Sequence, residues 1–192
     1  MIIFILIIAA ICFIYFNVIP GKFHTPAAWL SLIVTALCVI GIVEHDYNHW
    51  GMKGETTVQT QKLTSSAVPQ MPVLLYQPLG NGTEKIYLYK TADKPKKLVA
   101  TKTDKMAVKV NKNAKTAQVA IKTTRYVYKN KLDEAMFSIF GHNKELKKRE
   151  YVFSVPKNWQ VLSVKKAKEL QKQMQKRAAL LKKQQMQVQA NK

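Results

Sequence analysis

The sequence predicts a membrane-anchored α+β protein with an N-terminal two-helix transmembrane hairpin, a small mainly-β soluble domain and a C-terminal basic helix. Three observations predict this: two long apolar runs begin the chain, short alternating runs follow, and the last 30 residues are rich in lysine. The 192 residues include 31 Lys and Arg against 11 Asp and Glu, a net charge of +20. Only Lys22 is charged within residues 1–43, so residues 44–192 hold a net +19.

The first apolar run extends from Ile2 to Ile19 and is interrupted only by Asn17. Eighteen helical residues span roughly 27 Å, enough to cross the hydrocarbon core of a bilayer. Cleavage as a signal peptide is not expected, because no Lys or Arg precedes the run and no small-residue cleavage site follows it. We therefore expect residues 2–19 to form a membrane span.

The second apolar run, Pro26 to Val43, is also 18 residues long. Pro26 suits the first turn of a helix, and Trp29 suits a membrane interface. A tight loop, Pro20 to Thr25, separates the two runs, which predicts a helical hairpin. Two buried core helices are the alternative, but the remaining 149 residues offer no comparable apolar surface to enclose them.

Small residues within the two runs would allow the helices to approach closely: Ala9, Ala10, Ser31, Thr35, Ala36 and Gly41. Cys12 and Cys38 lie at depths that differ by roughly 6 Å at helical rise. No disulfide between them is expected.

The charges next to the spans give two answers about orientation. Lys22 lies in the loop, whereas Glu44 and Asp46 follow the second span, which favours a cytoplasmic loop and an extracytoplasmic domain. Counting further along the chain adds Lys53 and Lys62 and favours the reverse. We give the near flank more weight, because long domains translocate largely regardless of charge. The expected location is thus a bacterial cell membrane, with the soluble domain outside the cytoplasm.

Residues 44–55 form an expected juxtamembrane collar, in which Tyr47 and Trp50 suit the headgroup level. A metal site is the alternative reading, since His45 and His49 are four residues apart and would share a face of a continuing helix beside Asp46. No third well-placed ligand is identified, so no metal and no cofactor are expected.

Residues 56–160 alternate apolar and polar side chains, as half-buried strands do, and form the expected mainly-β domain. The clearest strands are Val73–Tyr76, Lys85–Lys90, Lys97–Lys102, Ala107–Asn111, Ala117–Thr123, Arg125–Lys129 and Tyr151–Val155. Asn81-Gly82 and Asn111-Lys112-Asn113 are expected hairpin turns, because Asn and Gly tolerate positive φ.

Two further helices are expected after the first strands. Apolar residues recur at helical spacing from Lys131 to Phe140 and end at Gly141, which predicts a helical lid on the sheet, with a ligand groove as the alternative. Residues 161–192 are expected to form a basic amphipathic tail, with Ser163 as its helix cap. Its cations are candidate polyanion contacts: Lys165, Lys166, Lys168, Lys172, Lys176, Arg177, Lys182 and Lys183. A helix packed on the domain, membrane-surface docking and a coiled-coil contact remain alternatives for it.

Several segments resemble a family of two-span membrane proteins of lactic-acid bacteria, domain of unknown function 4811. They are the hairpin together with Asn48-His49-Trp50-Gly51-Met52-Lys53, Leu74-Leu75-Tyr76-Gln77-Pro78-Leu79-Gly80, Glu84-Lys85-Ile86-Tyr87-Leu88-Tyr89-Lys90-Thr91 and Thr123-Thr124-Arg125-Tyr126-Val127-Tyr128-Lys129-Asn130. The resemblance extends to about Leu170. It implies an envelope context and supplies no catalytic residue.

No catalytic motif is recognised in the sequence, which contains only four histidines and no Cys-x-x-Cys pair, so an enzyme is not expected. The net charge suggests a polyanionic partner, either anionic lipid or a wall polymer. Nucleic acid is not expected, because no stacking or groove-entering module is recognised. The leading hypothesis is an envelope protein that presents a basic domain to anionic lipid or wall polymer. The second is an accessory subunit that packs its hairpin against a membrane protein partner.

Overall fold

The computed structural model describes residues 1–66, 71–80 and 83–190. Its contacts divide the chain into two compact units. Unit 1 comprises Met1–Thr57 and Thr123–Lys148, and unit 2 comprises Val58–Lys122 and Arg149–Lys192. Each unit is therefore built from two stretches that are far apart in the sequence.

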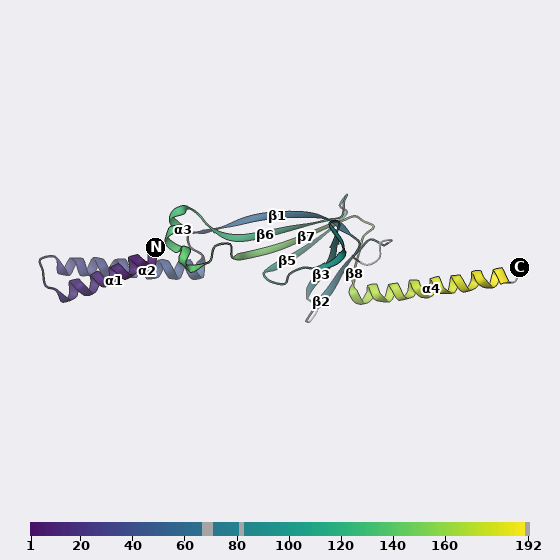
Figure 1. Ribbon diagram of the computed structural model, residues 1–192, viewed down its shortest axis with the longest axis horizontal. Helices are drawn as coiled ribbons and strands as arrows, with labels where there is room; N and C mark the ends of the chain where they lie inside the picture. The colour runs from purple at the N-terminus through teal and green to yellow at the C-terminus, as the bar shows by residue number, and fades with distance from the viewer. Residues whose placement is uncertain (67–70, 81–82, 191–192) are drawn as a thin grey trace. The chain divides into compact units, whose positions relative to one another are not determined.

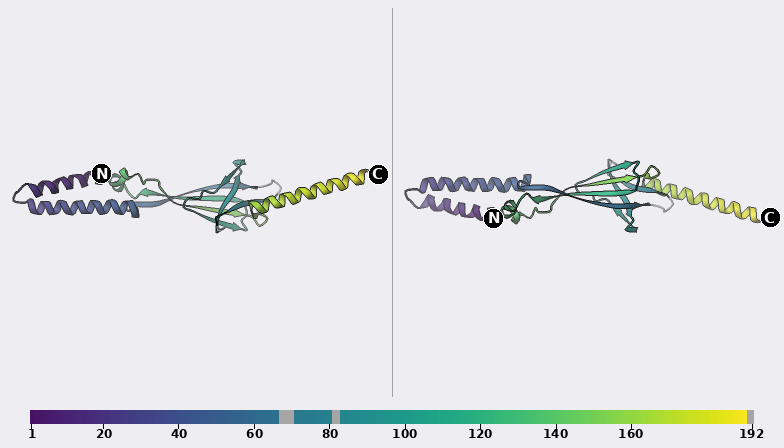
Figure 2. Two further views of the ribbon diagram at one scale, coloured as in Figure 1. Left: turned by 90° about the horizontal axis from the view of Figure 1, so that it is seen from below. Right: turned by 90° about the horizontal axis from the view of Figure 1, so that it is seen from above.

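Two apolar helices, α1 (Ile2–Val18) and α2 (His24–Asn48), begin unit 1 and lie side by side in both views of Figure 2. Pro26 falls in the first turn of α2, as predicted. Among the described residues, α2 is the one helix long and apolar enough to cross a membrane by length and composition, whereas α1 has only 17 residues. The helix α2 also continues five residues beyond the predicted end of the span at Val43.

Small residues lie where α1 and α2 pack. Ala9, Ser31 and Gly41 are buried, and a Cβ built on Gly41 would lie 3.3 Å from Ile2 Cδ1. Ala36, by contrast, is exposed. Cys12 and Cys38 are both free thiols, as expected.

Eight strands follow within the described residues (Figure 1). They are β1 (Met52–Thr64), β2 (Val73–Leu79), β3 (Glu84–Thr91), β4 (Lys94–Ala100), β5 (Met106–Lys112), β6 (Gln118–Tyr128), β7 (Leu146–Val155) and β8 (Gln160–Ser163). The order across the sheet is β5-β7-β6-β1-β3-β2-β8, and β4 also pairs with β3. Every expected strand overlaps an observed one, and Ala117–Thr123 and Arg125–Lys129 merge into β6.

Parallel pairing joins distant parts of the sequence. The strand β5 pairs with β7, with Met106 opposite Arg149, and β2 pairs with β8, with Val73 opposite Gln160. The hairpin predicted at residues 111–113 is therefore wrong. Asn113 does adopt a positive φ of 79°, but β5 pairs with β7 and not with β6. The turn predicted at Asn81-Gly82 lies outside the described residues.

The core of unit 2 lies on the sheet. Its buried members come from five strands: Leu63, Leu74, Tyr89, Val119, Tyr151, Phe153 and Val155. Phe153, which is fully buried, lies 5.4 Å from both Tyr87 and Tyr89 between ring centroids. Burial of Tyr87 and Tyr89 raises the pKa of both phenols.

The predicted helix at residues 131–140 forms as α3 (Lys131–Phe137) followed by the 3₁₀ turn η1 (Ser138–Phe140). Asn130 caps it by accepting a hydrogen bond from the Asp133 amide, and Gly141 ends it with φ 74°. Its expected position as a lid on the sheet is wrong. Its buried residue Phe137 packs instead in a cluster with Ile2 and Cys38 of the two apolar helices.

The last helix is α4 (Val164–Ala190), in unit 2. Ser163 caps it as predicted, because the Ser163 hydroxyl accepts a hydrogen bond from the Lys166 amide at 3.2 Å. Ala167 and Leu170 are half-buried where the first turns of α4 face β2. The basic side chains from Lys165 to Arg177 are exposed.

Candidate functional site

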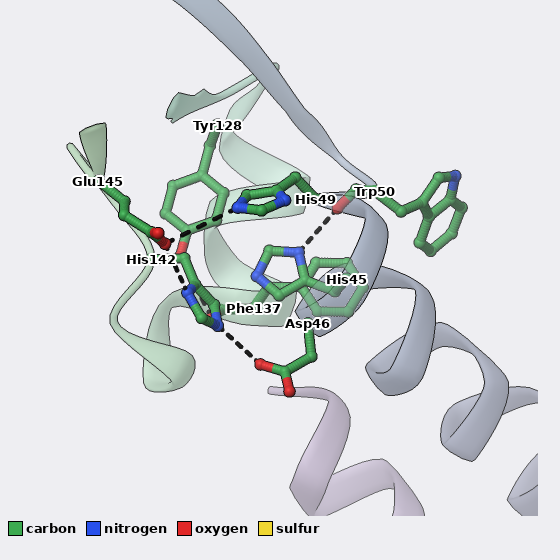
Figure 3. A network of polar contacts seen from close by, with 8 residues as sticks. All are labelled: His45, Asp46, His49, Trp50, Tyr128, Phe137, His142 and Glu145. Atoms are coloured by element: carbon green, nitrogen blue, oxygen red, sulfur yellow. Dashed lines mark hydrogen bonds and ion pairs between the residues drawn. The ribbon is translucent and has the colours of Figure 1, made fainter. Parts of the chain in front are cut away.

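A cluster of histidines gathers in unit 1 where α2 ends (Figure 3). His45 and Asp46 come from the last turns of α2, and His49 follows its final residue. His142 and Glu145 come from the segment between η1 and β7. The ring centroid of His142 lies 5.6 Å from that of His45 and 6.0 Å from that of His49.

His45 is the fully buried member of the cluster. Its Nδ1 lies 2.7 Å from the Trp50 carbonyl oxygen, so Nδ1–H donates and fixes the tautomer. Its ring stacks on Phe137 with centroids 4.2 Å apart and planes 10° apart. No hydrogen-bond partner of its Nε2 is present among the described residues. His45 thus ties the end of α2 to α3 by packing and to Trp50 by a hydrogen bond.

His142 lies between two carboxylates. Its Nε2 is 2.8 Å from Asp46 Oδ1, and its Nδ1 is 3.1 Å from Glu145 Oε2. A neutral imidazole has one N–H, whereas an imidazolium donates from both nitrogens, so this geometry suits the charged form. The hydrogen bond to Asp46 raises the pKa of His142, partial burial opposes this, and Glu145 acts in the same direction as Asp46.

His49 occupies the third corner of the cluster. Its ring stacks on Tyr126 at 3.8 Å between centroids, and its Nε2 is 3.7 Å from Glu145 Oε2. The residue has a left-handed backbone with φ 54°, because α2 ends at Asn48. The expectation that His45 and His49 share one face of a continuing helix is therefore wrong, although both reach the same cluster.

The cluster does not form a metal centre in this geometry. Over residues 1–66, 71–80 and 83–190, no three His, Cys, Asp or Glu side chains are grouped so as to hold a metal ion. The imidazole of His45 contacts a carbonyl oxygen, and that of His142 contacts two carboxylates. The arrangement connects the end of α2 to the segment before β7 through the contacts of His142 with Asp46 and Glu145, which we call the charged joint.

Sequence reasoning missed His142 and Glu145 as members of this site. A usable signal is present, because three of the four histidines follow the C-terminal ends of expected helices. The fourth, His24, begins α2 and contacts the Gly21 carbonyl oxygen at 2.6 Å.

The residues selected from the sequence lie elsewhere. Tyr47 and Trp50 are 77% and 56% exposed, so both are accessible for the interfacial role expected of them, which remains a prediction. The expected polyanion contacts lie along α4 in unit 2, and for Lys182 and Lys183 the structure gives no side-chain description.

Comparison with known protein families finds a match. The model of a family described as a domain of unknown function (DUF4811) matches residues 21–170. This range includes α2, all eight described strands and the histidine cluster, whereas α1 precedes it. The comparisons with curated proteins and with solved structures find no match.

Proposed function

The chain belongs to the family described as domain of unknown function 4811, and we propose its role from its physical features. We propose that it is a non-enzymatic protein that spans the bacterial cell membrane twice and presents a basic unit to anionic lipid or wall polymer. The observation that carries the proposal is the distribution of charge. Unit 1 contains 8 basic and 6 acidic residues, whereas unit 2 contains 23 basic and 5 acidic residues, a net of +18. A polyanion would be attracted to unit 2.

The outer faces of α1 and α2 support a membrane location. Phe4, Ile8 and Ile11 of α1 are 60–63% exposed, and Leu30 and Leu37 of α2 are 64% and 61% exposed. Two helices that are apolar on their outer faces as well as between them match a lipid environment better than water. This supports an N-terminal region that anchors in a membrane.

A second crossing by α1 is part of the proposal. Its 17 residues span about 25 Å, slightly less than the hydrocarbon core, and such mismatch is tolerated at modest cost. Polar side chains in the pair are satisfied locally: Asn17 donates to the Phe13 carbonyl oxygen, and Ser31 to that of Ala27. Because these polar side chains are hydrogen-bonded within their own helices, they need no water as a partner, and both helices are compatible with a lipid environment.

Topology can be tested by labelling of single cysteines in a background that lacks Cys12 and Cys38. Lys97, exposed on β4, and Lys22, in the loop between α1 and α2, are suitable sites. We expect a membrane-impermeant thiol reagent to label K97C and not K22C on intact cells, because Lys22 favours the cytoplasmic side. Label at K22C with protection of K97C would place unit 2 in the cytoplasm. Label at both would refute the two-span hairpin.

Polyanion binding can be tested with the full chain in zwitterionic nanodiscs. We expect it to bind anionic vesicles or a phosphate-containing wall polymer, and to lose that binding as rising ionic strength shortens the Debye length from about 30 Å at 0.01 M to about 3 Å at 1 M. Binding that is absent or independent of salt would refute the proposal.

Matched variants can locate the interaction. Three exposed lysines of α4 are replaced by Gln in one variant, and three exposed lysines of unit 1 in the other. The two sets are Lys165, Lys166 and Lys168, and Lys53, Lys131 and Lys148. Both variants lose three charges, but we expect a clearly larger loss of binding from the α4 variant. Equal losses would show that net charge alone matters.

The accessory-subunit hypothesis receives less support. It rests on small residues in the spans, and three of these, Ala9, Ser31 and Gly41, are buried where α1 and α2 pack. Exchange of α1 and α2 for an unrelated two-span anchor separates the two hypotheses. Retained function would favour the role of unit 2, and lost function would favour a hairpin partner.

A further inference from the structure

A groove in unit 1 lies between α2 and α3 and holds about 460 Å³, within the range of small-ligand sites, about 300–1,000 Å³. We call it the α2–α3 groove. Its lining is almost entirely apolar, and only Glu44 and Asp133 bring charge to it. The lining residues are Ile2, Val34, Leu37, Cys38, Ile40, Gly41, Glu44, Trp50, Leu132, Asp133, Met136 and Phe137.

The apolar part of the groove lies along α2. Gly41 lets Ile2 and Trp50 lie close to the backbone of α2, since a Cβ built on it would be 3.3 and 3.8 Å from their side-chain atoms. Leu37 and Ile40 at its edge are 61% and 58% exposed, so this part opens to the surroundings of α2. For a hairpin within a bilayer, those surroundings are acyl chains.

The polar part lies where the apolar stretch of α2 stops. Glu44 is the first charged residue after Lys22 in the sequence, and Asn48 Nδ2 donates to its Oε2 at 2.7 Å. Asp133, in the first turn of α3, lines the same groove. The indole of Trp50 also lines it and is 56% exposed. The lining thus changes from apolar to anionic and aromatic along the direction in which α2 leaves the proposed span.

We propose that the α2–α3 groove binds one membrane lipid with a primary-amine headgroup. This rests on the membrane insertion proposed above. The acyl chain lies along Val34 to Gly41, and the ammonium group lies between the carboxylates of Glu44 and Asp133. The two carboxylates attract the ammonium group of such a headgroup and repel the phosphate of a headgroup that carries no amine. The face of the Trp50 indole adds a cation–π attraction for the ammonium group.

The charge of the whole chain makes this preference diagnostic. A protein with a net charge of +20 attracts anionic lipids in general. A preference for an amine-bearing headgroup over a glycerol headgroup therefore runs against the overall field and has to arise from local groups. Among the groove residues, Glu44 and Asp133 are those groups.

Fluorescence quenching can measure occupancy, because Trp50 lines the groove. The probe protein is the full chain with Trp29→Phe and Trp159→Phe, which leaves Trp50 as the sole tryptophan. It is reconstituted in nanodiscs that contain a small fraction of brominated-chain lipid, with either an ethanolamine or a glycerol headgroup. We expect the ethanolamine lipid to quench Trp50 about two- to fivefold more effectively, the range of an exposed ion pair.

Two variants test the carboxylates. Glu44→Gln with Asp133→Asn should abolish the preference, whereas Glu134→Gln, which removes a charge from α3 outside the groove lining, should preserve it. Lipids retained on purification and identified by mass spectrometry should show the same enrichment and the same loss.

Each remaining outcome overturns the inference. Equal quenching by the two lipids would mean that the groove does not select a headgroup. Stronger quenching by the glycerol lipid would assign the contact to the overall positive charge. No quenching by either lipid would mean that something else, such as a partner helix, covers the groove. Failure of the membrane proposal is distinguishable, because the chain would then be released from membranes by alkaline carbonate.

Discussion

Replacement of His142 by Leu tests the charged joint at the end of α2. The variant removes both contacts of the imidazole, 2.8 Å to Asp46 and 3.1 Å to Glu145. A buried hydrogen bond to a charged group contributes about 1.5–3 kcal/mol. Here His142 is 24% exposed and the carboxylates are 49% and 40% exposed, so water screens them. We therefore expect a total local loss of about 1 kcal/mol.

Hydrogen exchange in unit 1 measures this loss directly. The Tyr126 amide donates to the Glu145 carbonyl oxygen at 2.9 Å, and the Lys144 amide donates to that of Tyr126 at 2.8 Å. A loss of about 1 kcal/mol corresponds to roughly fivefold faster exchange of these two amides. Amides of the β5–β7 ladder in unit 2 serve as the control and should not change.

The effect should depend on pH in a defined direction. The pKa of His142 is raised in the folded chain, so its stabilisation is complete below the unfolded pKa of about 6.5 and is lost as pH rises through the folded value. At each pH the variant is compared with the wild-type chain. The ratio of exchange rates should be largest near pH 6 and fall as pH increases. A ratio of one at pH 6, or a ratio that grows with pH, would refute this account of His142.

Four further substitutions, one of them a control, have expected effects that can be measured. Asn130→Ala removes the hydrogen bond that Oδ1 accepts from the Asp133 amide and should cost about 1 kcal/mol, seen as faster exchange in α3 only. Gly51→Ala places a Cβ on a residue with φ 81° and 3.2 Å from Asp133, so it should lower the free energy of unfolding by about 1–2 kcal/mol or more. Gly21→Ala, with open space around it, is the control and should be tolerated. Phe153→Ala empties a fully buried site in unit 2 and should cost about 3–5 kcal/mol in thermal unfolding followed by near-ultraviolet circular dichroism; a cost below 1 kcal/mol would contradict the assigned core.

Local sequence patterns predict where the helices and strands of this fold lie better than they predict which elements pack or pair with one another. The apolar runs, the helix ending at Gly141 and the cap at Ser163 are properties of neighbouring residues, and each is observed. The strand β1 is not among the clearest predicted strands, and its residues Lys53 to Thr60 are all exposed, so no buried face marks it. Pairing of β5 with β7 was not predicted, because an alternating strand does not identify its neighbour.

The candidate site illustrates the same limit. His45 and His49 were selected because their spacing is local, whereas the contact of Asp46 with His142 joins residues 96 positions apart. The sequence of residues 44–55 also does not predict that α2 ends at Asn48 or that His49 adopts a left-handed backbone conformation. Packing around Phe137 decides which side chains meet here, and single-sequence periodicity does not encode that packing.

The discontinuous composition of the two units has a consequence for folding. The cluster around His45 can form only after both parts of unit 1, Met1–Thr57 and Thr123–Lys148, have been synthesised. In the same way, the outer edge of β2 stays unpaired until β8 is available. High contact order slows folding, and unpaired strand edges favour association between chains in the interval. During synthesis the apolar helices emerge long before Phe137, so the nascent chain carries an open sheet beside an already hydrophobic N-terminal segment. The outer edge of β2 can pair only after residues 160–163 have emerged.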